Sequence, residues 1–270
     1  MMKAAEPLVR SWKAHLALGF ERDGKRTVLA RRAAEGPLVV QKALYPEGDE
    51  VCHAIVVHPP GGIAGGDELR LEVDSAGHAL LTTPGAAKWY RSAGPWAKQT
   101  LAFNVKGMLE WLPRETIVFD GALAELNCEV RLGSAARYIG WEIICLGRTG
   151  SGERFSNGRL KMHTQVFDEG KLVWTERGEL EGGAGELRSP VGLAGHSVFG
   201  TLLAAAPAFD AALVSECRRF AAVTVLPGLL VARYLGDSTE EAFQRFKSVW
   251  SLLRPAVAGR AAVEPRIWMT

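Results

Sequence analysis

Short runs of alternating apolar and polar residues, separated by turn residues, fill the chain from about residue 8 to residue 185. In the segment 67–74, for example, Leu69, Leu71 and Val73 alternate with charged residues. Alternation with a period of two places every second side chain on one face of a sheet. Such runs recur at roughly ten-residue intervals, and residues 168–170 (Asp-Glu-Gly) are expected to form a hairpin turn. The sequence therefore predicts a β-rich body.

The last third of the chain changes to a helical pattern. From Asp210 onward, three apolar residues can share one face of a helix: Leu213, Cys217 and Phe220. No linker-like tract rich in serine, proline and glycine separates this part from the alternating part. We therefore expect one domain over residues 1–270, with a β-rich body at about 8–207, a helical part at about 208–256 and a C-terminal tail at 257–270.

A second helix is predicted to begin at Asp237 or Ser238. Ser238 and Glu241 have the S-x-x-E spacing of a capping box. The apolar residues that follow at helical spacing are Phe243, Phe246, Trp250 and Leu253. Because proline cannot donate a backbone hydrogen bond within a helix, the helix is expected to end at Pro255.

The segment His58–Asp67, HPPGGIAGGD, fits neither a regular strand nor a helix. Its two prolines lack backbone donors and restrict φ, while its four glycines allow backbone conformations that are closed to other residues. The segment is therefore expected to be a shaped loop, or a backbone held very close to another group. Its ionisable side chains, His58 and Asp67, lie at its two ends.

Charge and composition exclude several classes of protein. The 32 Lys and Arg residues nearly balance 30 Asp and Glu, without a basic run, so neither nucleic acid nor an anionic membrane is an expected partner. The first 20 residues lack the apolar core of a signal peptide, and no apolar stretch is long enough to span a membrane. The four cysteines form no C-x-x-C pair, which is typical of reduced thiols. We expect a soluble cytoplasmic protein.

Three enzyme motifs are present only in incomplete form. Residues 19–25 match G-x-x-x-x-G-K, but Arg26 replaces the Ser or Thr that would bind Mg²⁺, so a hairpin is the preferred interpretation. Residues 195–200 read G-x-S-x-x-G rather than the G-x-S-x-G of a nucleophile elbow. Residues 147–155 lack the third glycine of a dinucleotide-binding loop. The sequence thus supports neither a nucleotidase, nor a hydrolase of this type, nor a dehydrogenase.

Sulfur, nitrogen and oxygen donors gather around the glycine-rich segment. Cys52, His53, His58 and Asp67 lie within sixteen positions, yet their spacing fits no zinc pattern. On a strand, Cys52 and His53 would face opposite sides and could not chelate together. A weak or transient metal site and no site at all both stay open.

Two further regions could form a partner surface. In 82–92, basic and aromatic side chains follow a Pro-Gly turn and could bind a carboxylate, a phosphate or a protein. In the second helix and the tail, large aromatic residues either fill the core or contact a partner. The candidate partner-binding residues are Lys88, Tyr90, Arg91, Trp250, Arg254, Arg266 and Trp268.

Seven segments occur in an order typical of one known family. They are HPPGGIAGGD, TTPGAAKWYRS, LEWLPRETIVFDGA, GWEIICLGR with GERF, HSVFGTLL, LPGLLVARYLGDSTEEA, and WSLLRP with PRIWMT. From about residue 15 to the C-terminus, the chain closely resembles the urease accessory protein UreD family, called UreH in some organisms. The resemblance implies a mainly β fold, a helix-like stack of many short strands in two layers, with about two α-helices in the C-terminal third.

The resemblance also implies a non-enzymatic role in assembling the nickel centre of urease. Family members bind UreF, which recruits the GTPase UreG, and the complex docks on the urease apoprotein to assist nickel insertion. Nickel is thought to pass through an internal tunnel in the family, and by position His58, Asp67 and Glu142 are the residues expected along it. No tightly bound cofactor is implied. Pairing of two copies within the accessory complex stays open.

Two other classes of function stay open beside this one. The first is a metal-dependent hydrolase that uses His58, Asp67 and Glu142. The second is a structural adaptor whose glycine-rich loop only shapes a surface. A metal held tightly with turnover would indicate the hydrolase, whereas nickel insertion that is indifferent to Asp67 would indicate the adaptor.

Overall fold

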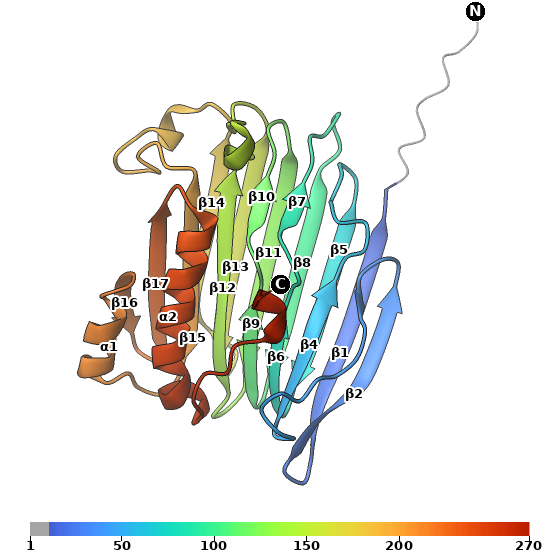
Figure 1. The fold of residues 1–270 in the computed structure, drawn as a ribbon, viewed down its shortest axis with the longest axis vertical. Coiled ribbons are helices and arrows are strands. Elements are labelled where there is room, and N and C mark those ends of the chain that lie inside the picture. The colour runs from blue at the N-terminus through green and yellow to red at the C-terminus, as the bar shows by residue number, and fades with distance from the viewer. Residues whose placement is uncertain (1–10, 270) are drawn as a thin grey trace, which may run out of the picture.

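The computed structural model describes residues 11–269, whose strands form two sheets (Figure 1). The first sheet has the order β14 (Lys171–Glu181), β13 (Arg159–Asp168), β11 (Leu123–Leu132), β8 (Ala97–Val105), β5 (Glu68–Ser75), β1 (Lys13–Asp23) and β2 (Arg26–Glu35). The second has the order β16 (Ala222–Leu226), β17 (Leu229–Gly236), β15 (Val198–Ala205), β12 (Arg137–Leu146), β9 (Met108–Leu112), β6 (His78–Thr82), β4 (Val51–Val57) and β3 (Val39–Val40). Two short strands complete the second sheet, β10 (Thr116–Val118) beside β12 and β7 (Ala87–Trp89) beside β10.

The chain passes back and forth between the two sheets. It runs from β4 in the second sheet to β5 in the first, returns to β6, and repeats this alternation through β8, β9, β11, β12 and β13. In this alternating part, neighbouring strands of one sheet are therefore parallel, as in the pairs β5–β8 and β6–β9. The predicted mainly β fold, a two-layer helix-like stack of strands, is confirmed.

Two hydrophobic cores lie on the two faces of the second sheet. The first is sandwiched between the sheets, and the second lies between the second sheet and the C-terminal helices. Neighbouring residues of one strand contribute to different cores, because successive side chains point to opposite faces. In β12, Trp141 packs in the outer core while Tyr138 and Ile144 pack between the sheets.

Helix α2 (Thr239–Ala258) lies across the outer face of the second sheet, and α1 (Ala211–Cys217) lies at its edge (Figure 1). The serine half of the predicted capping box is confirmed, since the Ser238 hydroxyl accepts the amide of Glu241 at 3.2 Å, whereas the Glu241 carboxylate bonds Tyr234 and Arg245. The four residues of its predicted apolar face, Phe243, Phe246, Trp250 and Leu253, are buried. Within residues 11–269, neither helix is long and apolar enough to cross a membrane.

The predicted end of α2 at Pro255 is wrong. The helix continues to Ala258 and ends at Gly259, whose φ is 68° and whose amide donates to the Pro255 carbonyl. Proline removes one hydrogen bond near the end of the helix, where Val257 still packs in the outer core. Burial of this last apolar side chain accounts for the extra turn.

The expected helical part at 208–256 contains a β-hairpin. Strands β16 and β17 lie between the two helices, joined by a turn in which Gly228 has a φ of 74°. Leu230, Ala232 and Tyr234 of β17 face the outer core under α2. The alternation in this segment thus extends the second sheet rather than forming a helix. Within residues 11–269 there are also three short 3₁₀ turns, η1 (Thr149–Ser151), η2 (Gly185–Leu187) and η3 (Arg266–Met269).

Both predicted tight turns are confirmed. Gly24, in the segment that resembles a phosphate-binding loop, has a φ of 60° between the paired residues Asp23 and Arg26. Glu169 and Gly170 both have positive φ between β13 and β14, as a two-residue hairpin turn of this type requires.

Candidate functional site

The glycine-rich segment 58–67 is the connection from β4 to β5, where the chain crosses from one sheet to the other. Its middle is held by backbone bonds, because the Ile63 amide donates to the Lys88 carbonyl at 2.7 Å and the Tyr90 amide donates to the Ile63 carbonyl at 2.8 Å. A side chain on Gly62 would overlap the Tyr90 ring. The glycines thus allow two backbone segments to lie in direct contact.

Asp67 ties this loop to the start of β1. Its side chain is 2% exposed, and its two oxygens accept the amides of Trp12 at 2.7 Å and Ala64 at 2.8 Å. Asp67 does not line the internal cavities described below. Both carboxylate oxygens of Asp67 thus accept a backbone amide, outside the walls of these cavities, and contact between Asp67 and a metal ion stays a prediction.

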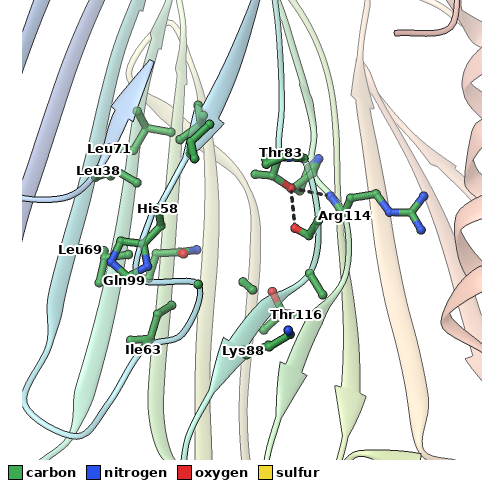
Figure 2. Close-up of a pocket in the computed structure, with 18 of the residues that line it drawn as sticks. Leu38, His58, Ile63, Leu69, Leu71, Thr83, Lys88, Gln99, Arg114 and Thr116 are labelled. Carbon is green, nitrogen blue, oxygen red and sulfur yellow. Dashed lines mark hydrogen bonds between the residues drawn. The ribbon is translucent and has the colours of Figure 1, made fainter. Parts of the chain in front are cut away.

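A cavity of about 300 Å³ lies between the two sheets beside the loop (Figure 2). Leu69 and Leu71 of the first sheet form one apolar wall, and Val56 and Trp111 of the second sheet form part of the other. The ionisable and amide or hydroxyl side chains that reach it are His58, Thr83, Lys88, Gln99, Arg114, Thr116 and Glu142. The cavity is apolar with a few convergent polar groups, which is typical of a small-molecule or ion site.

Glu142 is the acidic residue of this cavity. It lies in β12 with its carboxyl deep in the molecule, partly accessible because the cavity reaches it. Burial raises the pKa of Glu142 to about 7, although the Thr116 hydroxyl donates a hydrogen bond of 2.7 Å to its Oε1. A carboxyl of this kind can exchange a proton for a cation near neutral pH.

His58 lines the same cavity at the start of the loop. Burial lowers the pKa of its imidazole, an effect that the negative charge of Asp67 partly opposes. The imidazole is thus kept neutral, which is the form that binds metals. Its Nε2 is buried without a hydrogen-bond partner among the described residues, as is Nε1 of Trp111 in the cavity wall. Buried polar atoms of this kind are normally satisfied by water or a ligand.

A second cavity of about 80 Å³ continues from the first between the same sheets. The two cavities share four wall residues: Gln99, Leu101, Trp111 and Glu142. Cys128, Tyr138 and Glu176 add polar groups to the second cavity. Burial raises the pKa of the Cys128 thiol far above its ordinary value, so this thiol is protonated. Glu142 thus stands where one internal space meets the next.

The three predicted metal-contacting residues therefore separate into two groups. The fold brings His58 and Glu142 to one cavity, whereas Asp67 bonds the backbone amides of Trp12, directly before β1, and Ala64. Over residues 11–269, no three His, Cys, Asp or Glu side chains are grouped so that they could hold a metal ion. A chelating set of His58, Asp67 and Glu142, which the hydrolase interpretation requires, is not assembled.

The predicted partner-binding residues also divide. Lys88, Tyr90 and Arg91 are exposed; the Tyr90 ring packs edge-on against Phe119, and Arg91 pairs with Asp120 at 3.2 Å. In the tail, Arg266 is exposed, whereas Trp268 is half-buried and donates from Nε1 to the Thr82 hydroxyl at 2.8 Å.

Trp250 and Arg254 are fully buried, so they present no surface to a partner. The Arg254 guanidinium bonds Glu110 at 3.1 Å and Glu47 at 2.6 and 2.7 Å, and the Trp250 indole also donates to Glu110. His78 and His53 complete this buried network through Glu110 and Glu47. The expected contact of these two residues with a partner is therefore corrected: both lie in the interior. There the charge of Arg254 is balanced by Glu47 and Glu110.

Sequence reasoning missed Gln99, Thr116 and the polar residues of the second cavity. Gln99 and Thr116 lie on strands in which the pattern shows alternation but not which sheet lies opposite. Their functional signal exists only once the two sheets are stacked. Glu142 could be found because it stands out as an acidic residue within the apolar run GWEIICL.

Comparison with known proteins places this site in context. Residues 13–269 match the model of a family described as UreD urease accessory protein. The chain is similar to a urease accessory protein UreD of Azoarcus sp. strain BH72, with 54% identity over 100% of this chain and 97% of that protein. It is also similar to the UreD proteins of Dechloromonas aromatica strain RCB (52% identity, 96% and 95% covered) and Nitrosococcus oceani (48% identity, 96% and 91% covered).

Proposed function

The chain belongs to the UreD family of urease accessory proteins, and from this premise we propose that it assists the insertion of nickel into urease. In this proposal it is a non-enzymatic scaffold in the cytoplasm. It binds UreF and, through UreF, the GTPase UreG, which hydrolyses GTP. The assembly, with one or two copies of this chain, docks on the urease apoprotein, and nickel is its cargo rather than a resident cofactor.

The observation that carries the proposal is the pair of adjoining cavities that meet at Glu142. A cation crossing an apolar interior needs oxygen or nitrogen donors in place of its hydration shell. Glu142 and the neutral imidazole of His58 supply one donor of each kind in the first cavity. Because they do not form a closed cage, they suit brief contact better than storage.

The raised pKa of Glu142 also supports a role for this residue in the passage of nickel. With a pKa of about 7, the empty site can carry a proton that an arriving divalent cation displaces. Thr116 holds the carboxyl in one orientation by donating to Oε1. Release of the ion then restores the protonated, neutral state, which is the one that burial favours.

Replacement of Glu142 tests this role. We expect Glu142→Gln to lower the nickel content and activity of urease matured in cells by about tenfold or more, since a loss of this size corresponds to roughly 1.4 kcal/mol at one ion contact. Complex formation with UreF should be unchanged. Nickel is measured by elemental analysis of purified urease.

Glu181→Gln is the matched control, because Glu181 lies on the surface of the first sheet with its side chain 60% exposed. Nickel content that falls equally in both variants, or in neither, would contradict a role for Glu142 in transit. Unchanged nickel content of urease in cells lacking this chain altogether would contradict the proposed function as a whole.

A further inference from the structure

A third pocket, of about 400 Å³, lies at the ends of β12 and β15, apart from the two cavities between the sheets. It is enclosed by the loop 147–156, the excursion 183–197 and Asp237 at the end of β17. These loops, which include η1 and the segment that follows β14, lie together at one end of the molecule (Figure 1). None of its residues belongs to the predicted site.

The pocket lies in line with the second cavity. Ile144 and Phe199 line the cavity, while Leu146, two positions farther along β12, and Ser197, directly before β15 and two positions from Phe199, line the pocket. Because side chains two positions apart on a strand share a face, both spaces are bounded by the same face of the second sheet. The pocket is therefore the surface feature that follows next along this face.

Two arginines give the pocket its charge. Arg154 is exposed, and its guanidinium makes no hydrogen bond or ion pair with any described residue. Arg188 makes one long bond, from Nη1 to the Gly183 carbonyl at 3.5 Å. Guanidinium groups with unused donors bind carboxylates and phosphates in a planar, paired geometry.

The two carboxylates of the pocket are already engaged. Glu153 accepts from Nε and Nη2 of Arg148 at 3.1 and 2.8 Å, and this bonding lowers its pKa. Asp237 bonds Nδ1 of His196 at 2.8 Å and accepts the Ser197 amide at 3.0 Å, which lowers its pKa. Neither carboxylate is paired with Arg154 or Arg188, so the unused guanidinium donors of these two arginines are the groups of the pocket that can bind an anion.

We infer that Arg154 and Arg188 form a docking pocket for an acidic segment of the urease apoprotein, a step that rests on the proposed function. A protein is favoured over a small anion because Val191, in the same excursion as Arg188, is 98% exposed. Charged contacts beside an exposed apolar side chain are typical of protein interfaces. Docking here would place the metal recipient next to the end of the internal cavities.

Binding of the full chain to immobilised urease apoprotein tests the inference. We expect R154E/R188E to weaken the Kd by about tenfold or more, because like charges then face each other in the interface. The difference should shrink as salt screens the charges. Thermal unfolding of the variant checks that its fold is retained.

The control is R22E/K25E, the same charge reversal on the exposed hairpin between β1 and β2, at the opposite end of the molecule from the excursion (Figure 1). The apoprotein binding as tightly to R154E/R188E as to the unaltered chain would overturn the inference and leave the proposed function standing. Equal weakening by both double variants would also overturn it, since the effect would then reflect total charge. An unaltered chain that does not bind urease would refute the docking step of the proposed function itself.

Discussion

Two buried glutamates of this chain have pKa values shifted in opposite directions. Burial raises the pKa of Glu142 to about 7, and one hydroxyl from Thr116 does not offset it. Burial would raise the pKa of Glu47 as well, but hydrogen bonds from His53 and Arg254 outweigh it and lower the value to about 2. The hydrogen-bond and charge partners, rather than the depth of burial, decide whether a buried carboxyl can exchange a proton near neutral pH or stays ionised.

The shift of Glu142 makes stability depend on pH. Its folded pKa lies above the ordinary value of 4.5, so the native state favours the protonated form. Its contribution is complete below about pH 4.5 and is lost as the pH rises through 7. Glu142→Gln stays neutral, so its stability relative to the unaltered chain should rise from about pH 4.5 through pH 7 and reach a gain of about 3 kcal/mol by pH 8.

Urea unfolding of both proteins at pH 4.5, 6 and 8 measures this difference. Glu181→Gln, at an exposed site, is the control measured in parallel. A constant difference between Glu142→Gln and the unaltered chain across this range would mean that Glu142 titrates normally.

At the scale of elements, the glycine-rich loop is shaped by what it contacts. Ile63 joins it to the segment that carries Lys88 and Tyr90, and Asp67 joins it to Trp12. The loop thereby positions His58 at the cavity while its own carboxylate serves the backbone. The loop therefore contributes one ionisable side chain to the cavity, the imidazole of His58, together with Gly61, Gly62 and Ile63.

Asp67 should therefore matter chiefly for stability. Asp67→Ala leaves the amides of Trp12 and Ala64 without their acceptor, which costs about 1–3 kcal/mol in the free energy of unfolding. Asp67→Asn keeps one carbonyl oxygen and should lose less. Chemical denaturation provides the measurement.

Asp49→Ala is the control, since Asp49 is 65% exposed beside Arg26 and its loss should change stability by no more than about 0.5 kcal/mol. If Asp67→Asn were fully stable yet failed to support nickel delivery, direct contact between Asp67 and the ion would regain support.

At the scale of the whole molecule, a buried network joins segments that lie far apart in the sequence. Arg254 of α2 bonds Glu47, 207 positions earlier, and Glu110 of β9. Glu110 and the cavity residue Trp111 are neighbours on opposite faces of one strand. Strand β9 thus contributes Glu110 to the contact with α2 and Trp111 to the wall of the first cavity.

The network should weaken in acid. The folded pKa of Glu47 lies at about 2, below its ordinary 4.5, so its contribution is complete above about pH 4.5 and is lost as the pH falls toward 2. Glu47→Gln should be less stable than the unaltered chain by about 3 kcal/mol at pH 6, with the difference vanishing near pH 2. Thermal or urea unfolding across this range provides the test.

Glu50→Gln is the neighbouring control, because Glu50 pairs with Arg260 with its side chain 51% exposed and should show a small effect. A Glu47→Gln deficit that persists unchanged at pH 2 would show that lost packing, rather than lost charge, is responsible.

Local patterns were sufficient for the elements whose causes are local. The hairpin turns at Gly24 and Gly170 and the Ser238 cap depend on residues within a few positions, and each forms as predicted. The predicted helix end at Pro255 was wrong because the effect of this proline depends on whether Val257 is buried, and burial is a tertiary property. The β16–β17 hairpin was missed because a short apolar run fits a strand or a helix equally well.

The sequence by itself determined that the chain is mainly β, where its turns lie, which face of α2 is apolar, and, through seven ordered segments, its family. The tertiary structure alone decided that His58 and Glu142 meet in one cavity, that Asp67 holds the backbone, and that Trp250 and Arg254 lie inside. The physical reason is the distance along the chain over which each interaction acts. Alternation specifies which side chains share a face within one strand, whereas parallel pairing and the stacking of two sheets bring together residues far apart in the chain, and only that stacking sets burial, charge partners and pKa.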